Sequence, residues 1–226
     1  MKYLTLFAAL FALSLTASAD PADKQPLNTS PEPALSGKDF VELFNGKNLN
    51  GWVQEGGDHR FEVKDGAIVG TCVPGEANGF LCTKATYSDF VFTTEFKWEE
   101  KGNSGVMFRA DTKDSNDRVF GYQAEMDPGG RRWTGGIYGE AMGGWKYPLK
   151  GDALKDARQA VRDHFEWNRL TIKAEGNVIK TWINGVPVAH LVNDERENGF
   201  FGLQVHSGKK GTIHWRKLKV KELSVD

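Results

Sequence analysis

The segment DFVFTTEFKW, residues 89–98, alternates between two kinds of side chain along its length. One set of alternate positions carries Phe90, Phe92, Thr94, Phe96 and Trp98. Alternate side chains of a β-strand point to opposite faces of its sheet. The segment therefore predicts a strand that turns one face to a hydrophobic core and turns the other, with Glu95 and Lys97, away from it.

The same period-two pattern recurs through the chain, separated by turn residues. Residues 60–71 predict two strands around an Asp-Gly turn, and residues 168–191 predict three strands joined by Gly-Asn and Asn-Gly turns. Residues 151–165 are the stretch with clear helical character. Together these features predict an all-β protein, a sandwich of two antiparallel sheets with one short loop helix.

The N-terminus has the three parts of a secretory signal peptide. Lys2 supplies positive charge, an apolar run follows, and small residues precede Asp20. We therefore predict a signal peptide over residues 1–19, a Pro-rich disordered linker over 20–36 and one domain over 37–226. The alternative is an uncleaved membrane anchor, but the apolar run is shorter than the ~20 residues of a membrane span. We expect a periplasmic or secreted protein with no membrane anchor after signal cleavage.

Charge and cysteine content narrow the classes of function. The chain has 29 basic and 30 acidic residues and a net charge of −1. This balance predicts no binding of nucleic acid. Cys72 and Cys82 flank a turn-rich stretch, so a disulfide across a hairpin and two half-buried thiols are both open. The sequence contains no CxxC or HExxH motif, and hence no zinc signature.

A second alternating segment, GYQAEMDPGG at residues 121–130, places Gln123, Glu125 and Asp127 on one face. The polar faces of four predicted strands together carry Glu95, Lys97, Arg109, Gln123, Glu125, Asp127, Gln204 and His206. If these strands are neighbours in one curved sheet, its concave face forms a polar groove. The alternative is four independent solvated faces. Between two of these strands, GNSG at residues 102–105 is interpreted as a turn whose polar side chains bond the backbone.

A Gly-rich segment at residues 131–148 carries several aromatic side chains, and long segments of this kind often have a function. Its aromatic residues are Trp133, Tyr138, Trp145 and Tyr147. Because sugar rings have apolar C–H faces that stack on aromatic rings, we predict that Tyr138 and Trp145 bind a sugar. The alternative is that the rings close one end of the sandwich. For Trp133 this alternative is as strong as contact with a ligand.

Five motifs, in this order, resemble one known family. They are FVELFNGKNLNGW, GNSGVMFRA, GYQAEMDPGGRRWTGGIYGE, WNRLTIKAEGNVIKTWINGVPV and GFFGLQVHSG. The chain resembles the 3-keto-disaccharide hydrolase family from about Phe40 to Leu223. The resemblance implies a concanavalin A-like jelly roll of two antiparallel sheets, in agreement with the period-two pattern.

The resemblance also implies an activity, the cleavage of glycosides oxidised at C3 of the sugar. Family members are implied to act as lyases on 3-keto-glucosides or as hydratases of the resulting 3-keto-2-hydroxy-glucal, with net hydrolysis when both steps occur. The C3 ketone acidifies the C2–H bond, a base removes that proton, and the C1–O bond breaks. Such a site needs a base, a group that stabilises the enolate and an acid for the leaving oxygen.

Candidate residues of the required types are present. We predict Glu125, His206, Arg109 and Asp127 as catalytic: Glu125 or His206 as the base, Arg109 to hold enolate charge and Asp127 to orient a neighbour. The predicted substrate-binding residues are Gln123, Glu95, Tyr138, Trp145 and Gln204. A divalent metal ion held by Glu125, His206 and Glu95 is an optional cofactor that would also stabilise an enolate.

The chain departs from the family pattern at one place, and two other functions are also compatible with the sequence. Many family members have Glu-x-Gln where this chain has Gln123 and Glu125, so roles do not transfer directly. The first alternative function is a non-catalytic carbohydrate-binding module, because jelly rolls serve both purposes. The second is ordinary glycoside hydrolysis by Glu125 with Glu95 or Asp127. In each case the partner is a small-molecule sugar.

Overall fold

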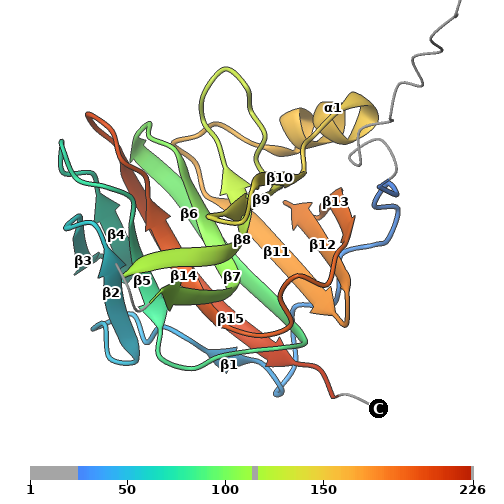
Figure 1. Ribbon diagram of the computed structural model, residues 1–226, viewed down its shortest axis with the longest axis horizontal. Coiled ribbons are helices and arrows are strands. Elements are labelled where there is room, and N and C mark those ends of the chain that lie inside the picture. The colour runs from blue at the N-terminus through green and yellow to red at the C-terminus, as the bar shows by residue number, and fades with distance from the viewer. Residues whose placement is uncertain (1–24, 114–116, 225–226) are drawn as a thin grey trace, which may run out of the picture.

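A computed structural model describes residues 25–113 and 117–224. The predicted signal peptide and residues 20–24 of the predicted linker lie outside the described residues. Two antiparallel β-sheets pack face to face, as predicted, and one short helix lies at one end of the sandwich (Figure 1). The helix is α1, Gly151–Ala160, which ends five residues before the predicted boundary and packs against β13.

The first sheet has eight strands in the order β13-β12-β11-β6-β15-β4-β3, with β1 added beside β15. The bounds are β1 Val41–Glu42, β3 Arg60–Lys64, β4 Ala67–Thr71, β6 Phe90–Glu100, β11 Asn168–Glu175, β12 Val178–Ile183, β13 Val186–Val192 and β15 Thr212–Glu222. The predicted hairpins at residues 60–71 and 168–191 both form in this sheet.

The second sheet has seven strands in the order β10-β9-β8-β7-β14-β5-β2. The bounds are β2 Trp52–Gly56, β5 Gly79–Thr83, β7 Ser104–Lys113, β8 Arg118–Met126, β9 Ile137–Glu140, β10 Gly144–Tyr147 and β14 Phe200–Val205. Three of the four strands with predicted polar faces, β7, β8 and β14, are therefore neighbours in one sheet, and β6 belongs to the other.

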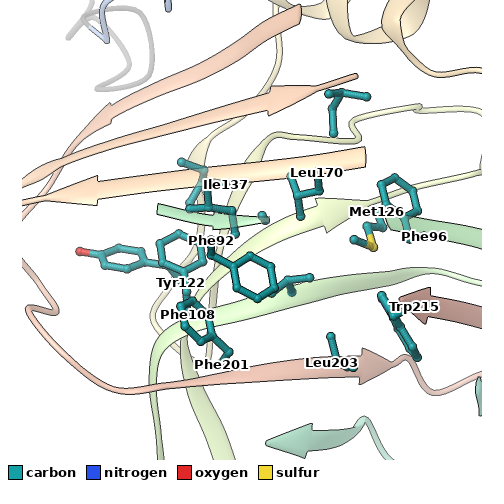
Figure 2. Packing of buried hydrophobic residues seen from close by; sticks show 14 of the residues in the cluster. Phe92, Phe96, Phe108, Tyr122, Met126, Ile137, Leu170, Phe201, Leu203 and Trp215 are labelled. Carbon is teal, nitrogen blue, oxygen red and sulfur yellow. The ribbon is translucent and has the colours of Figure 1, made fainter. Parts of the chain in front are cut away.

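The core between the sheets is built from the apolar face of each strand. Phe92 of β6 stacks on Phe201 of β14, with ring centroids 4.5 Å apart, and Phe108 stacks on Tyr122 at 5.5 Å. Figure 2 shows these four rings gathered between the ribbons of the two sheets. Each is buried, so burial of aromatic surface from both sheets supplies much of the driving force for their packing.

The predicted linker has an ordered part, which corrects the expectation of disorder over residues 20–36. Residues 25–36 run across the outer face of the eight-stranded sheet. The Asn28 side chain donates to the Thr181 carbonyl, and the Glu32 carboxylate accepts bonds from Arg169 and Thr171. Trp182, on the same outer face, donates its indole N–H to the Ser30 carbonyl and is 1% exposed. The segment covers apolar surface that would otherwise meet water.

Truncating the chain at residue 37 is expected to destabilise the domain. Relative to the chain that begins at residue 20, loss of this cover and its hydrogen bonds should lower the free energy of unfolding by about 2–4 kcal/mol. Urea unfolding, followed by tryptophan fluorescence, measures the difference. Equal midpoints and slopes for the two chains would show that residues 25–36 contribute nothing to stability.

Two local features bear on the sequence predictions. Cys72 and Cys82 are both free and buried, which decides between the disulfide and the two thiols that the sequence left open.

In strand β7, Arg109 and Ala110 together face a single residue of β8, Gly121, because the register shifts between Phe108 and Asp111. This is a β-bulge, and Arg109 adopts φ 46° within it.

No helix in the described part of the chain combines the length and the apolar character needed to cross a membrane.

Candidate active site

A cavity of about 620 Å³ opens on the outer face of the seven-stranded sheet. Of the nine predicted site residues, seven line it: Gln123, Glu125, Asp127, Tyr138, Trp145, Gln204 and His206. The alternation in β8 explains why the first three point there. Ala124 and Met126 are buried in the core between the sheets, so the intervening polar side chains face outward. The structure thus brings together groups that lie up to 83 positions apart in the sequence.

Gly105 of β7 lies between two polar side chains of the site. It pairs with Glu125 of β8 on one side and with Gln204 of β14 on the other. Neighbouring strands are ~4.8 Å apart, so the two outer backbones are ~10 Å apart across the glycine. A Cβ at position 105 would lie 2.5 Å from the Gln123 side chain. The absence of a side chain at Gly105 therefore keeps space for Gln123 at the floor of the cavity.

Glu125 is a buried carboxylate held by three donors. Its Oε1 accepts hydrogen bonds from Asn103 Nδ2 at 2.6 Å and Arg131 Nη2 at 2.9 Å, and its Oε2 accepts one from Gln123 Nε2 at 3.0 Å. Burial is the largest influence on the pKa of Glu125 and raises it above its ordinary value. The three donors lower the pKa, and Asp127 adds a smaller increase. A fixed carboxylate with increased basicity is suited to taking a proton from a substrate.

Arg131 connects the two acidic residues of β8 to the aromatic segment. Its Nε donates to Asp127 Oδ2 at 2.9 Å, while its Nη2 binds Glu125. The guanidinium also lies over the rings of Trp133 and Trp145, 5.1 Å and 4.8 Å from their centroids. Asp127 is thereby paired with an arginine that the sequence prediction did not include.

The aromatic segment contributes a wall of edge-packed rings. Trp145 meets Trp133 with centroids 4.6 Å apart at 83°, and Tyr138 with centroids 5.2 Å apart at 67°, both edge to face. Tyr138 and Trp145 line the cavity. Trp133 instead packs against the core between the sheets and stacks under Arg131, which favours the structural role considered for it.

Two amide side chains of the cavity have polar atoms without a partner within the described residues. Gln204 is fully buried, and neither its Oε1 nor its Nε2 forms a hydrogen bond. Gln123 is 2% exposed, and its Oε1 is also unpaired. Buried polar groups are almost always hydrogen-bonded in native proteins. Because both amides line the cavity, a polar ligand or water within it would satisfy them.

His206 and Glu140 complete the lining. His206 follows the end of β14, is exposed, and its ring Nδ1 lies 2.7 Å from the Ser207 carbonyl oxygen. Glu140 of β9 is 3.9 Å from Arg118, and burial raises its pKa, opposed by Arg118, His206 and Asn78. The prediction missed Glu140, although alternation places it on the same face of β9 as Tyr138.

Two predicted residues lie outside this cavity, and the fold explains both. Glu95 belongs to the eight-stranded sheet, where it pairs with Arg216 and Lys217 on the outer face. Arg109 was expected on the outward, polar face of its strand. The β7 bulge gives that face to Ala110, which packs in a cluster with Met107, and directs Arg109 to Asp89 at 2.8 Å. From these positions Glu95 cannot bind a substrate in this cavity, and Arg109 cannot hold enolate charge there.

Residues 102–105 do not form the predicted turn, because Ser104 and Gly105 begin strand β7. The Asn103 side chain, just before this strand, binds the Glu125 carboxylate and lines the cavity rather than bonding the local backbone. This role depends on a contact with Glu125, which lies 22 positions further along the chain. No local signal in the sequence could therefore identify it.

The predicted metal ligands do not gather. Glu95 lies on the other sheet from Glu125 and His206. Among the described residues, no three His, Cys, Asp or Glu side chains form a group that could hold a metal ion. The donor set of the cavity is instead dominated by amides, a guanidinium and paired carboxylates.

Solved structures share the fold. A provisionally assigned glycosyl hydrolase from Parabacteroides distasonis matches with a TM-score of 0.63 at 19% identity, covering 84% of this chain and 99% of that one. A Bacillus subtilis protein of unknown function with a galectin-like fold has a TM-score of 0.58 at 15% identity, with coverages of 85% and 97%. The carbohydrate-binding module CBM66 from Bacillus subtilis has a TM-score of 0.50 at 16% identity, with coverages of 77% and 98%. These matches support the predicted jelly-roll sandwich.

No protein of the curated set matches this chain. The model of one family, described as the 3-keto-alpha-glucoside-1,2-lyase-like domain, matches residues 39–221. That range spans both sheets and every element that lines the cavity. The chain belongs to this family of the 3-keto-alpha-glucoside-1,2-lyase-like domain, as the order of its motifs predicted, and its function is related to carbohydrates.

Proposed function

We propose that this protein is an exported enzyme that cleaves 3-keto-glycosides by elimination across C1 and C2. The observation that carries the proposal is the buried carboxylate of Glu125, which lies across Gly105 from the unpaired amide of Gln204. A sugar ring between them offers a C2–H to the carboxylate and oxygen atoms to the amides. Family membership and the proposed signal peptide support the substrate class and the compartment.

In this proposal Glu125 removes the C2 proton. Its Oε2 accepts only one hydrogen bond, from Gln123, within the described residues, and a carboxylate oxygen has two lone pairs. The electron pair of the C2–H bond forms an enolate whose negative charge develops on the C3 oxygen. Arg131 and the unpaired Nε2 of Gln204 are the donors available to stabilise it. Departure of the C1 oxygen yields a 3-keto-2-hydroxy-glucal.

The aromatic wall supports the same reading. Tyr138 and Trp145 present ring surface inside a cavity otherwise lined by polar groups, a combination that suits the C–H faces and hydroxyls of a sugar. A non-catalytic binding module would need the same wall. It would not need a buried carboxylate. Burial opposes the ionisation of a carboxyl group, and burying a charge costs free energy. This feature favours the enzyme over the binding module.

The direct test compares a methyl 3-keto-glucoside with its unoxidised parent. We expect turnover of the keto sugar alone, detected as the unsaturated product by ultraviolet absorbance, because only the ketone acidifies C2–H. Turnover of the parent would support ordinary glycoside hydrolysis, and binding of the keto sugar without turnover would support the binding module. Either result contradicts the proposal.

His206 provides a second variant for this assay. Replacing it with alanine is expected to lower kcat/KM on the keto sugar by about 10²-fold, if its imidazole hydrogen-bonds the reacting sugar. His190→Ala, on strand β13 of the other sheet, is the matched control and should retain wild-type kinetics. Wild-type rates in His206→Ala would remove this residue from the mechanism.

A further inference from the structure

A second cavity, of about 610 Å³, adjoins the candidate site. Its floor includes Gly57, Ala77 and Phe80 beside strands β2 and β5, and its other side is formed by Asp117 and Arg118 of the β7–β8 hairpin. Asn78 and Glu140 line both cavities. The two cavities therefore adjoin at these two side chains.

The β7 bulge explains why the second cavity exists. Beyond the bulge, the β7–β8 hairpin reaches β2, a strand at the far edge of the same sheet. Val119 packs with Phe80 and Met107 in a hydrophobic cluster separate from the main core. Figure 1 shows β8 crossing in front of β14 and β15. The hairpin thus covers part of the outer face, and the second cavity lies beneath it.

The lining of the second cavity fits a hydroxylated ring. Asp117, Arg118 and Ser207 offer hydrogen-bonding groups, and the edges of the buried Phe80 and Val119 side chains complete the lining. A sugar ring has the same combination, with C–H faces and hydroxyl groups. A second sugar unit could therefore lie here while the keto sugar occupies the first cavity.

Glu140 lies where such a two-ring substrate would be joined. Its side chain is 12% exposed, and Arg118 is 3.9 Å away. Burial raises the pKa of Glu140, so its carboxyl retains a proton at higher pH than an ordinary glutamate does. A protonated carboxyl at this junction can act as an acid.

We propose that the second cavity holds the leaving group of the substrate, a second sugar, and that Glu140 protonates the departing oxygen. This inference rests on the proposed elimination. Glu125 takes the C2 proton, the C2–H electron pair passes through the enolate into the C1–C2 double bond, and the C1–O pair remains on the leaving oxygen. That oxygen takes the proton of the Glu140 carboxyl. The products are the glucal and a free sugar hydroxyl, with Glu125 protonated and Glu140 ionised; exchange with water restores both.

The acid role is tested with leaving groups of different basicity. Glu140→Gln is expected to lower kcat by about 10²-fold or more on a methyl 3-keto-glucoside and on a 3-keto-disaccharide, whose leaving oxygens need a proton. On a p-nitrophenyl 3-keto-glucoside the loss should stay within about 3-fold, because nitrophenolate leaves unprotonated. Near wild-type turnover of the aryl substrate also demonstrates that the variant is folded. Equal losses on all three substrates, or no loss on any, would overturn the acid role.

The leaving-group cavity is tested by filling it. The wild-type protein should have a kcat/KM about 10–100-fold higher for the disaccharide than for the methyl glycoside, from contacts in the second cavity. Ala77→Trp should abolish this preference and leave the methyl glycoside unaffected, because Ala77 lines only the second cavity. Ala85→Trp, at another exposed loop position, is the matched control.

The outcomes separate the two proposals. If the wild-type protein turns over none of the keto sugars, the elimination itself fails and this inference fails with it. If it turns them over but has no preference for the disaccharide, or if Ala77→Trp retains that preference, only the leaving-group cavity is overturned.

Discussion

Glu125→Gln is expected to lower kcat/KM on a 3-keto-glucoside by about 10²–10⁴-fold, the range usual for loss of a general base. Glutamine has nearly the same shape as glutamate, so the cavity keeps its volume. Its oxygen can still accept from Asn103 and Arg131. Its amide nitrogen would face the Gln123 side chain. If the Gln123 amide rotates by 180°, its unpaired Oε1 can accept a hydrogen bond from that nitrogen. The variant should therefore fold and bind the sugar but fail to abstract the proton.

The same variant should change how stability depends on pH. The folded-state pKa of Glu125 is raised, so the stability associated with its protonated form is complete below its unfolded-state pKa and is lost as pH rises through the folded-state value. Glutamine cannot ionise and does not suffer this loss. The melting temperature of the variant minus that of the wild type should therefore increase from pH 4 to pH 8.

Kinetic and thermal measurements on the same samples check both effects. Glu62→Gln, at an exposed position of β3, is the matched control and should alter neither quantity. A Glu125→Gln protein with wild-type kcat/KM would exclude Glu125 as the base. A pH-independent difference in melting temperature would instead contradict the raised pKa.

Arg109→Met is expected to lower the free energy of unfolding by about 3–5 kcal/mol, the cost of breaking a buried ion pair from one side. Arg109 is 1% exposed and donates to the carbonyls of Ser88, Gly176 and Arg196 and to the Asp89 carboxylate. Methionine fills similar space but leaves these acceptors without their donor. It adds no new backbone restriction, because any non-glycine residue is disfavoured at φ 46°.

Denaturant unfolding measures this loss, and Arg60→Met at an exposed edge of β3 should change stability by less than ~0.5 kcal/mol. At temperatures where the Arg109→Met protein is folded, its kcat/KM should remain near wild type. The opposite pattern, unchanged stability with lost activity, would restore the catalytic role that the sequence suggested and would contradict the position of Arg109 in the fold.

Alternation identified the faces of strands but not their neighbours. Gln123, Glu125 and Asp127 were predicted correctly to share a face, because a regular strand obeys period two. The same rule correctly placed Glu95 on an outward face. It could not predict to which of the two sheets the strand of Glu95 belongs. Strand pairing depends on contacts between distant segments, and these are invisible to a local pattern.

Local rules failed for Arg109 and Asn103 for different reasons. The bulge inserts one residue into β7 and so reverses the side to which Arg109 points. Asn103 lies in the connection between β6 and β7, and its partner Glu125 lies on β8. Arg131 was missed because a single charged residue in a loop has no periodicity that distinguishes it from ordinary surface, whereas Glu140 was missed although alternation places it on the same face as Tyr138.

The bulge also limits how this chain can vary in length. Removing one residue between Met107 and Asp111 would restore simple pairing with β8 and remove the bend and extra twist that the bulge gives to the strand. Arg109 would lose its acceptors, and the hairpin would no longer reach β2 to enclose the second cavity. Relatives that bind a second sugar in this way should therefore keep the same number of residues in β7, and their insertions and deletions should fall elsewhere.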